Sequence, residues 1–290
     1  MSRKFKSSLV LLGLAIMVLV MAACGNNNTA ANNATSTNAA GSNASTSTAN
    51  TTKNEPQTKV ELTISAAASL TDALNDIQKT YEEKNPNVKL NFNFGASGAL
   101  QQQIEQGAPA DLFLSAAAKN LKALVDKQLI DTDKQTNLLS NELVVVVPAD
   151  GGVALATEAD LTKADVKHVA IGIPESVPAG NYAKESLTNA KLWDSLQSKS
   201  VQGKDVRQVL QYVETGNADA GFVYKTDALT SDKVKIAFNV DPATYTAIQY
   251  PIGIVKATKH SKEAEDFYTY LQSQETLDVF VKYGFSVPAK

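Results

Sequence analysis

The chain of 290 residues contains one cysteine, one tryptophan and two histidines. A single thiol cannot form an internal disulfide. His168 and His260 lie far apart without the spacing of a metal site, so no cation site is expected. Basic side chains are not in excess either, because 27 Lys and Arg face 30 Asp and Glu, for a formal net charge of −3. No basic patch is visible in the sequence, and a nucleic-acid partner is therefore not expected.

Long hydrophobic runs are also missing. The longest, Leu9 to Met21, has 13 residues, follows Arg3, Lys4 and Lys6, and ends in Met21-Ala22-Ala23-Cys24. It is too short to span a bilayer comfortably and is typical of a signal peptide. We expect residues 1–23 to be a lipoprotein signal, with cleavage before Cys24 and lipid on its sulfur and amine. The protein would then be exported and anchored to the outer face of the cell membrane. The alternative is that Cys24 is a stray thiol.

Residues 24–58 lack aromatic side chains and consist mostly of Asn, Ala, Thr and Ser. Such a segment cannot bury enough apolar surface to offset its ordering entropy. We expect a disordered stalk between the lipid and a folded part that begins at residue 59.

The folded part alternates strand and helix patterns, which favours an α/β fold with largely parallel sheets. Strands are expected at residues 60–64, 88–94, 111–114, 143–148, 168–173, 221–224 and 252–255. Because the strand–turn–helix pattern occurs in two blocks with a final return, we predict two lobes and two crossing segments, near 143–148 and 250–256. Lobe 1 would comprise residues 59–144 and 252–290, and lobe 2 residues 145–251.

Small polar residues stand where strand patterns pass into helix patterns. Ser69 follows the strand at 60–64 and precedes a helical face of Leu70, Leu74, Ile77 and Tyr81. A hydroxyl and free backbone N–H groups at a helix N-terminus form an anion site, although a serine there can also be a simple N-cap. No conventional catalytic group accompanies this device. We therefore predict a protein that captures a small oxyanion and releases it unchanged, rather than an enzyme.

A serine hydrolase is the enzyme alternative. The stretch Gly95-Ala96-Ser97-Gly98-Ala99 carries alanine where the nucleophile elbow requires glycine. The two histidines also stand in no recognisable triad context.

Several segments resemble the molybdate-binding proteins of ABC importers, in order and over residues 60–288. They are Ala66-Ala67-Ala68-Ser69-Leu70-Thr71-Asp72-Ala73-Leu74, Gln106-Gly107-Ala108-Pro109-Ala110-Asp111-Leu112-Phe113, Val177-Pro178-Ala179-Gly180-Asn181-Tyr182-Ala183-Lys184, Asp205-Val206-Arg207 and Lys282-Tyr283-Gly284-Phe285. The resemblance implies a two-lobed type II periplasmic-binding-protein fold. It also implies a protein, which we expect to be a monomer without a cofactor, that delivers molybdate, often also tungstate, to a membrane permease with its ATPase.

The resemblance also implies the ligand set. Ser69 and Ser97 would each offer a hydroxyl and an N–H group from the first lobe. Ala179 and Val206 would offer backbone N–H groups from the second lobe, and Tyr224 its phenol. Another tetrahedral oxyanion, sulfate above all, remains the alternative ligand, because the sequence does not measure the spacing of the donors.

Arg207, which follows Val206, is not expected to contact the ligand directly. Arg207 should face solvent or support its loop, since a direct cation would blunt size selectivity. The serine motif at residues 95–99 departs from many family members, which have a longer Ser/Thr run there. We therefore expect a less polar pocket rim.

Overall fold

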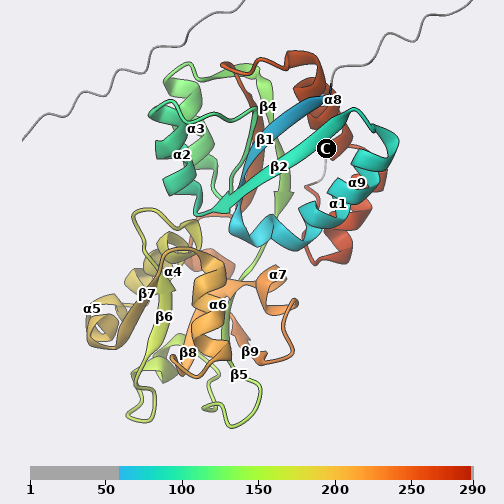
Figure 1. The fold of residues 1–290 in the computed structure, drawn as a ribbon. Coiled ribbons are helices and arrows are strands. Elements are labelled where there is room, and N and C mark those ends of the chain that lie inside the picture. Colours follow the sequence, from blue (N-terminus) through green and yellow to red (C-terminus); the bar gives the residue numbers. More distant parts are fainter. Residues whose placement is uncertain (1–58, 289–290) are drawn as a thin grey trace, which may run out of the picture. The chain divides into compact units, whose positions relative to one another are not determined.

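The computed structural model describes residues 59–288, which belong to one compact unit made of two lobes (Figure 1). Each lobe contains a five-stranded sheet, with strand orders β2-β1-β3-β10-β4 and β7-β6-β8-β5-β9. The predicted two-lobed α/β fold is confirmed. The expected signal peptide, Cys24 and the expected stalk lie outside the described residues.

The first lobe is a mixed sheet covered by helices on both faces (Figure 1). Its strands are β1 (Val60–Ala67), β2 (Val88–Gly95), β3 (Leu112–Leu114), β4 (Ile130–Ser140) and β10 (Gln249–Val255). Its helices are α1 (Thr71–Lys84), α2 (Ser97–Glu105), α3 (Ala118–Asp126), α8 (Ser261–Leu271) and α9 (Gln274–Lys282), with a short 3-10 turn at Ala68–Leu70 before α1. Helices α2 and α3 cover one face, and α1, α8 and α9 cover the other.

The second lobe repeats this plan with shorter elements. Its strands are β5 (Leu143–Pro148), β6 (Val169–Gly172), β7 (Ser200–Gly203), β8 (Ala220–Tyr224) and β9 (Val234–Asn239). Its helices are α4 (Pro178–Asn189), α5 (Trp193–Leu196), α6 (Val206–Glu214) and α7 (Lys225–Ala228), with 3-10 turns at Glu158–Thr162, Gln197–Lys199 and Pro242–Thr244. Helices α4 and α6 pack on β6 and β8.

Apolar periodicity explains how the helices dock. Leu70, Leu74, Ile77 and Tyr81 form the predicted face and are at most 3% exposed. Burying such a stripe against a sheet is the main source of helix stability in a protein of this kind. No helix within residues 59–288 combines the length and hydrophobicity that crossing a bilayer requires.

The prediction of largely parallel sheets is wrong. In each sheet two strand pairs are parallel and two are antiparallel, and the antiparallel pairs all involve β10 or β5. These two strands follow the connections between the lobes, so they enter their sheets from the opposite end.

The connections themselves are short. The chain changes sheets between Ser140 and Leu143 and again between Asn239 and Gln249. The segments expected to cross, near 143–148 and 250–256, are instead the strands β5 and β10, each inside one sheet. Their apolar character on both faces reflects burial beneath helices rather than passage between lobes.

Candidate functional site

A small cavity lies between the lobes and is lined only by uncharged residues. The lining comprises Ala67, Ala68, Ser69, Gly95, Ala96, Ser97 and Ala116 from the first lobe, and Val177, Pro178, Ala179, Val206 and Tyr224 from the second. All five residues expected at the site, Ser69, Ser97, Ala179, Val206 and Tyr224, are among them. The volume open to the centre of a water molecule is about 10 Å³. That is room for about one water molecule, so an amino acid or a sugar would not fit.

Four helix beginnings meet at this cavity. Ser69 lies in the 3-10 turn that leads into α1, Ser97 is the first residue of α2, Ala179 the second of α4 and Val206 the first of α6. First-turn N–H groups have no acceptor within their own helix. Together with the helix dipoles, such groups favour a negative charge at this point without a mobile counter-ion.

Glycines at Gly180 and Gly98 allow two of these helix beginnings to pack closely against neighbouring backbone. A Cβ atom on Gly180 would lie 1.9 Å from the carbonyl oxygen of Gly172, so only glycine lets the first turn of α4 rest on β6. A Cβ atom on Gly98 would lie 2.6 Å from the carbonyl oxygen of Ser176. Its absence allows the Gly98 N–H group to donate to that oxygen at 2.9 Å, which joins α2 to the opposite lobe.

The two serine hydroxyls already have protein partners. The N–H group of Ala116 donates to Ser97 Oγ at 2.9 Å. Ser69 Oγ lies 2.8 Å from the hydroxyl oxygen of Tyr250. Both serines are almost completely buried, at 1% and 3% exposure. Each can still engage one further group in the cavity, because a hydroxyl provides one donor and two acceptor sites.

Among the polar side chains that line the cavity, Tyr224 has a hydroxyl without a hydrogen-bond partner within residues 59–288. It is 1% exposed, and its hydroxyl has no hydrogen-bond partner in the described part of the chain. Burial raises the pKa of Tyr224 well above its usual value, so the phenol remains a donor. A buried hydroxyl without a partner costs about 1–3 kcal/mol. A ligand that accepts a hydrogen bond would remove that cost.

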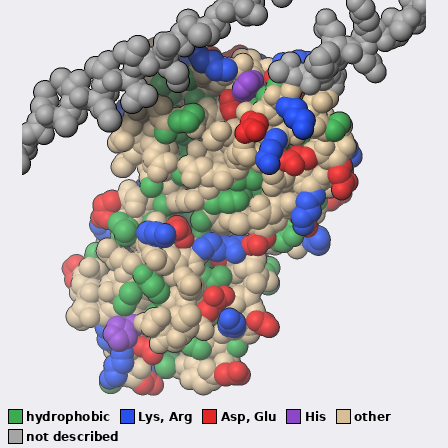
Figure 2. All heavy atoms as spheres, in the orientation of Figure 1, with side chains coloured by type: hydrophobic (Ala, Val, Ile, Leu, Met, Phe, Trp, Pro, Cys, Tyr) green, Lys and Arg blue, Asp and Glu red, His purple; other side chains and the backbone are tan. Residues whose placement is uncertain are grey.

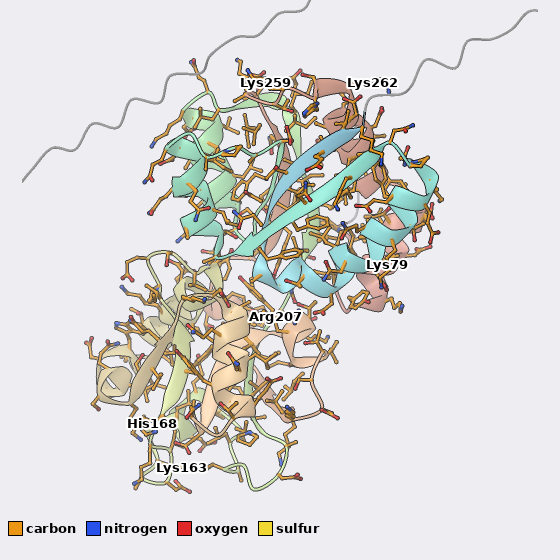
Figure 3. The ribbon with its side chains drawn as sticks, viewed as in Figure 1. Lys79, Lys163, His168, Arg207, Lys259 and Lys262 are labelled. Carbon is orange, nitrogen blue, oxygen red and sulfur yellow. The ribbon has the colours of Figure 1, made fainter. Side chains whose placement is uncertain are left out.

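The charged residues Arg207, Asp72 and Asp227 do not line the cavity, and Arg207 forms ion pairs with both carboxylates. Arg207 lies where the lobes meet (Figure 3). Its Nη2 atom is 2.6 Å from Asp72 Oδ2 in the first lobe, and its Nε atom is 2.6 Å from Asp227 Oδ1 in the second. The Arg207 side chain is 26% exposed. It therefore supports the site instead of facing solvent, and it ties the N-terminal turn of α6 to that of α1.

Asp227 is fully buried beside this arginine. Burial raises the pKa of its carboxyl group to about 6, although the charge of Arg207 acts in the opposite direction. The carboxylate also accepts a hydrogen bond from the backbone N–H group of Tyr224 at 3.3 Å. The ion pair thus anchors the strand end that presents the Tyr224 phenol.

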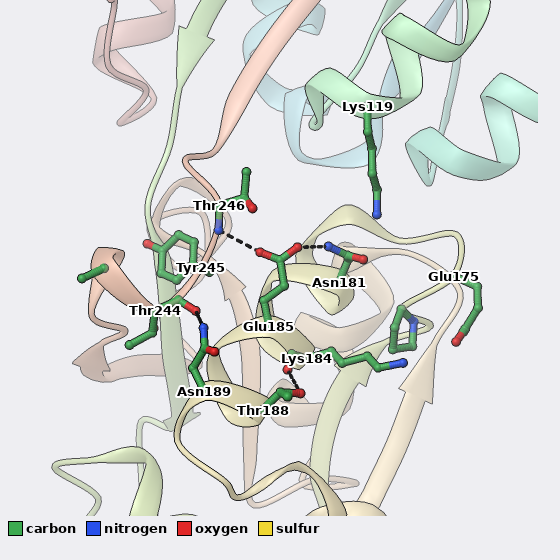
Figure 4. Close-up of a pocket in the computed structure, with 12 residues that line it drawn as sticks. Lys119, Glu175, Asn181, Lys184, Glu185, Thr188, Asn189, Thr244, Tyr245 and Thr246 are labelled. Carbon is green, nitrogen blue, oxygen red and sulfur yellow. Dashed lines mark hydrogen bonds between the residues drawn. The ribbon is translucent and has the colours of Figure 1, made fainter.

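A second, larger pocket of about 720 Å³ opens between α3 and α4 (Figure 4). Lys119 enters it from the first lobe, and Lys184, Glu175 and Glu185 line it from the second. Glu185 accepts hydrogen bonds from the side chain of Asn181 and from the Thr246 N–H group. This pocket exposes charges of both signs and is open to solvent, unlike the small cavity.

Residues 59–288 hold no cluster of three or more His, Cys, Asp and Glu side chains that suits a metal ion. Acidic and basic side chains are interspersed over the face in Figure 2.

Sequence reasoning missed Tyr250 and Asn141, and it missed the pairing of Arg207 with Asp72. The Ser69–Tyr250 contact joins residues 181 positions apart, and the Arg207–Asp72 contact joins residues 135 apart. Local patterns carry no signal for contacts of that kind, since the chain fold alone brings the partners together.

Comparisons with known proteins agree with this geometry. Residues 62–286 match the family described as bacterial extracellular solute-binding protein. YvgL of Bacillus subtilis, by name an ABC transporter substrate-binding lipoprotein, is 54% identical over 235 residues, which cover 81% of this chain and 90% of that protein. The molybdate-binding protein ModA of Haemophilus influenzae is 38% identical over 232 residues, 78% of this chain and 90% of that protein.

Solved structures show the same likeness. A structure titled as the substrate binding domain of a molybdenum ABC transporter from Clostridium difficile has 45% sequence identity and a TM-score of 0.62. The match covers 80% of this chain and 100% of that one. The chain therefore belongs to the family of bacterial extracellular solute-binding proteins.

Proposed function

We propose that this protein captures molybdate between its two lobes and delivers it to the permease and ATPase of an ABC importer. The observation that carries the proposal is a small inter-lobe cavity lined by hydroxyls and helix-start amides and by no charged side chain. The names of the relatives point to the same ion. The hydrolase alternative is set aside, because the family consists of solute-binding proteins.

The donor set suits this ion chemically. Molybdate at neutral pH is a tetrahedral dianion without a proton, so its oxygens only accept hydrogen bonds. Ser69, Ser97 and Tyr224 would donate through hydroxyls, and Ala179 and Val206 through backbone N–H groups. A hydrogen bond to a charged group contributes about 1.5–3 kcal/mol. Five such bonds exceed the costs of desolvation and ordering enough for a dissociation constant of roughly nanomolar to micromolar.

Tungstate has the same shape and charge, and we propose that it binds as well. Sulfate has the same charge but is smaller, so fixed donors spaced for the larger ion would contact it less well. A calorimetric panel of molybdate, tungstate, sulfate, phosphate and chromate tests this order directly. The proposal requires molybdate or tungstate to bind most tightly. Tighter binding of sulfate, or no binding of any of the five, would overturn it.

We also propose that the mature protein is a monomer anchored by lipid on Cys24. The sequence Met21-Ala22-Ala23-Cys24 at the end of the expected signal supports the anchor, and the lipoprotein name of the Bacillus relative agrees with it. Mass spectrometry of the processed N-terminus should find a diacylglycerol-modified cysteine. Cys24→Ser should instead release the protein from the membrane fraction, and retention of that variant would exclude the anchor.

A further inference from the structure

We propose that Tyr250 is a positioning residue that sets the direction of the Ser69 hydroxyl, so that its O–H bond points into the cavity and donates to the bound anion. This inference rests on the proposed function and goes beyond it, because Tyr250 does not line the cavity. A series of hydrogen bonds leads from the Glu142 backbone through Asn141 and Tyr250 to Ser69.

The first side chain in this series of hydrogen bonds is that of Asn141, in the short connection between β4 and β5. The backbone N–H group of Glu142 donates to Asn141 Oδ1 at 2.9 Å. An amide has one oxygen and one nitrogen end, so this contact fixes which end points where. The Nδ2 group must then face the other way. There it donates to Thr226 Oγ1 at 2.9 Å and to the hydroxyl oxygen of Tyr250 at 3.2 Å.

Tyr250 receives that hydrogen bond deep in the protein, at 1% exposure. Its own proton needs an acceptor, because buried hydroxyls in native proteins are nearly always paired. Asn141 Nδ2 is a donor and cannot serve. Ser69 Oγ at 2.8 Å can, so the tyrosine donates and the serine accepts. Burial raises the pKa of Tyr250 well above its usual value, and the phenol therefore keeps this proton.

Ser69 is left with its own proton and a position on the cavity wall. With one acceptor site occupied by Tyr250, its O–H bond can turn toward the cavity and donate to an oxygen there. Ser97 reaches the same state more simply, since the Ala116 N–H group occupies its acceptor side at 2.9 Å. One serine is directed by the backbone of its own lobe, and the other by a side-chain relay.

The relay also has a consequence for selectivity. A directed Ser69 hydroxyl favours an oxyanion without protons. It matches hydrogen phosphate less well, because the O–H group of that anion needs an acceptor, which a Ser69 hydroxyl pointed into the cavity does not offer. The relay starts in one connection between the lobes, and Tyr250 lies at the start of β10 beside the other. The direction of Ser69 thus depends on residues that join the two lobes.

A double-mutant cycle on the full-length protein, with molybdate as the probe in calorimetry, tests this role. Tyr250→Phe removes only the hydroxyl and should weaken binding roughly three- to tenfold in the wild-type background. In the Ser69→Ala background the same change should alter the dissociation constant by less than about twofold, because no hydroxyl remains to be directed. Equal losses in both backgrounds would overturn the proposal.

Two controls make the cycle specific. Ser65→Ala removes a serine that is as buried as Ser69, at 3% exposure, and does not line the cavity, so it should leave affinity unchanged. The ratio of phosphate to molybdate affinity should rise in Tyr250→Phe, since the freed Ser69 hydroxyl can then also accept. A merely structural loss would lower both affinities together.

A second variant keeps the proposal testable if Tyr250→Phe folds poorly. Asn141→Asp replaces the donor Nδ2 by an acceptor, which reverses the Tyr250 hydroxyl and turns the Ser69 lone pairs toward the anion. Its loss of affinity should shrink severalfold in the Ser69→Ala background, whereas simple charge repulsion would persist there and contradict the relay. Failure of the wild-type protein to bind any tetrahedral oxyanion would instead defeat the proposed function.

Discussion

The two cavities between the lobes differ in almost every property that matters for ligand choice. The larger one, about 720 Å³, is open and lined by Lys119, Lys184, Glu175 and Glu185. The smaller one has about 10 Å³ for the centre of a water molecule and contains no charged side chain. Size alone therefore does not identify a binding site. A buried anion needs oriented donors that are already in place, and only the small cavity supplies them from four helix beginnings.

Introducing a negative charge into each cavity in turn should give the largest difference in molybdate affinity. Ser97→Asp puts a carboxylate against a bound dianion at contact distance, where repulsion at an effective dielectric of about 20 reaches several kcal/mol. Molybdate affinity should fall by roughly a thousandfold or more. Lys119→Glu reverses a charge in the larger pocket and should change affinity by less than about threefold at physiological salt, because screening is strong there. A similar loss from both variants, measured by calorimetry, would erase the distinction between the cavities.

The charged pair behind the small cavity should govern stability. The pKa of Asp227 is about 6 in the folded protein against 3.8 when unperturbed, so folding favours its neutral form. Its contribution is therefore full below about pH 4 and is lost as the pH rises through 6, a swing of about 3 kcal/mol. Asp227→Asn should remove this swing.

Urea unfolding of both proteins from pH 4 to pH 7 measures the effect. The stability of the wild type relative to Asp227→Asn should decrease with rising pH across that window. A difference that stays constant would show that Asp227 does not titrate there. Because the comparison is between two proteins with otherwise identical groups, the remaining titrations largely cancel.

Removing the hydroxyl of Tyr224 or of Tyr245 should distinguish an effect on molybdate affinity from an effect on stability, and these are the smallest effects that we expect. The Tyr224 hydroxyl has no partner, so Tyr224→Phe should leave the ligand-free fold unchanged or slightly more stable. It should nevertheless weaken molybdate binding by about 2 kcal/mol, or roughly thirtyfold. Tyr245, in the larger pocket, accepts a hydrogen bond from the Leu143 N–H group at 3.2 Å.

Tyr245→Phe should therefore show the opposite pattern. It should cost about 1 kcal/mol of stability and leave molybdate affinity unchanged. Thermal unfolding without ligand, combined with calorimetry, measures both quantities for each variant. If Tyr224→Phe destabilised the protein and bound molybdate normally, its hydroxyl would belong to the core and not to the site.

Every interior strand was predicted from the sequence, whereas three edge strands were not. Val88–Gly95 is an edge strand that still alternates cleanly, and it was expected. The strands Ile130–Ser140, Ser200–Gly203 and Val234–Asn239 were not expected, and each lies at the edge of its sheet. Edge strands face solvent, and polar residues from Asp131 to Asn137 hide the period-two pattern there. The strand Val234–Asn239 does alternate, with Val234, Ile236 and Phe238 at every second position, so its pattern was present but overlooked.

The candidate site divides in a similar way. The five expected residues, Ser69, Ser97, Ala179, Val206 and Tyr224, stand at strand–helix junctions and line the cavity, and the family resemblance implied each of them. The residues that support these five could not be predicted from the sequence. Tyr250, Asn141 and Asp72 reach the site through contacts between segments distant in the chain, and the pKa of Asp227 depends on burial that only the packed lobes create.

A crystal structure of the protein grown with molybdate would show where the ion binds, because the anomalous signal of molybdenum locates it without ambiguity. We expect one strong peak in the small cavity, within hydrogen-bond distance of the Ser69, Ser97 and Tyr224 hydroxyls and the Ala179 and Val206 N–H groups. A peak in the larger pocket beside Lys119, or an ion held directly by lysine or arginine side chains, would contradict this expectation.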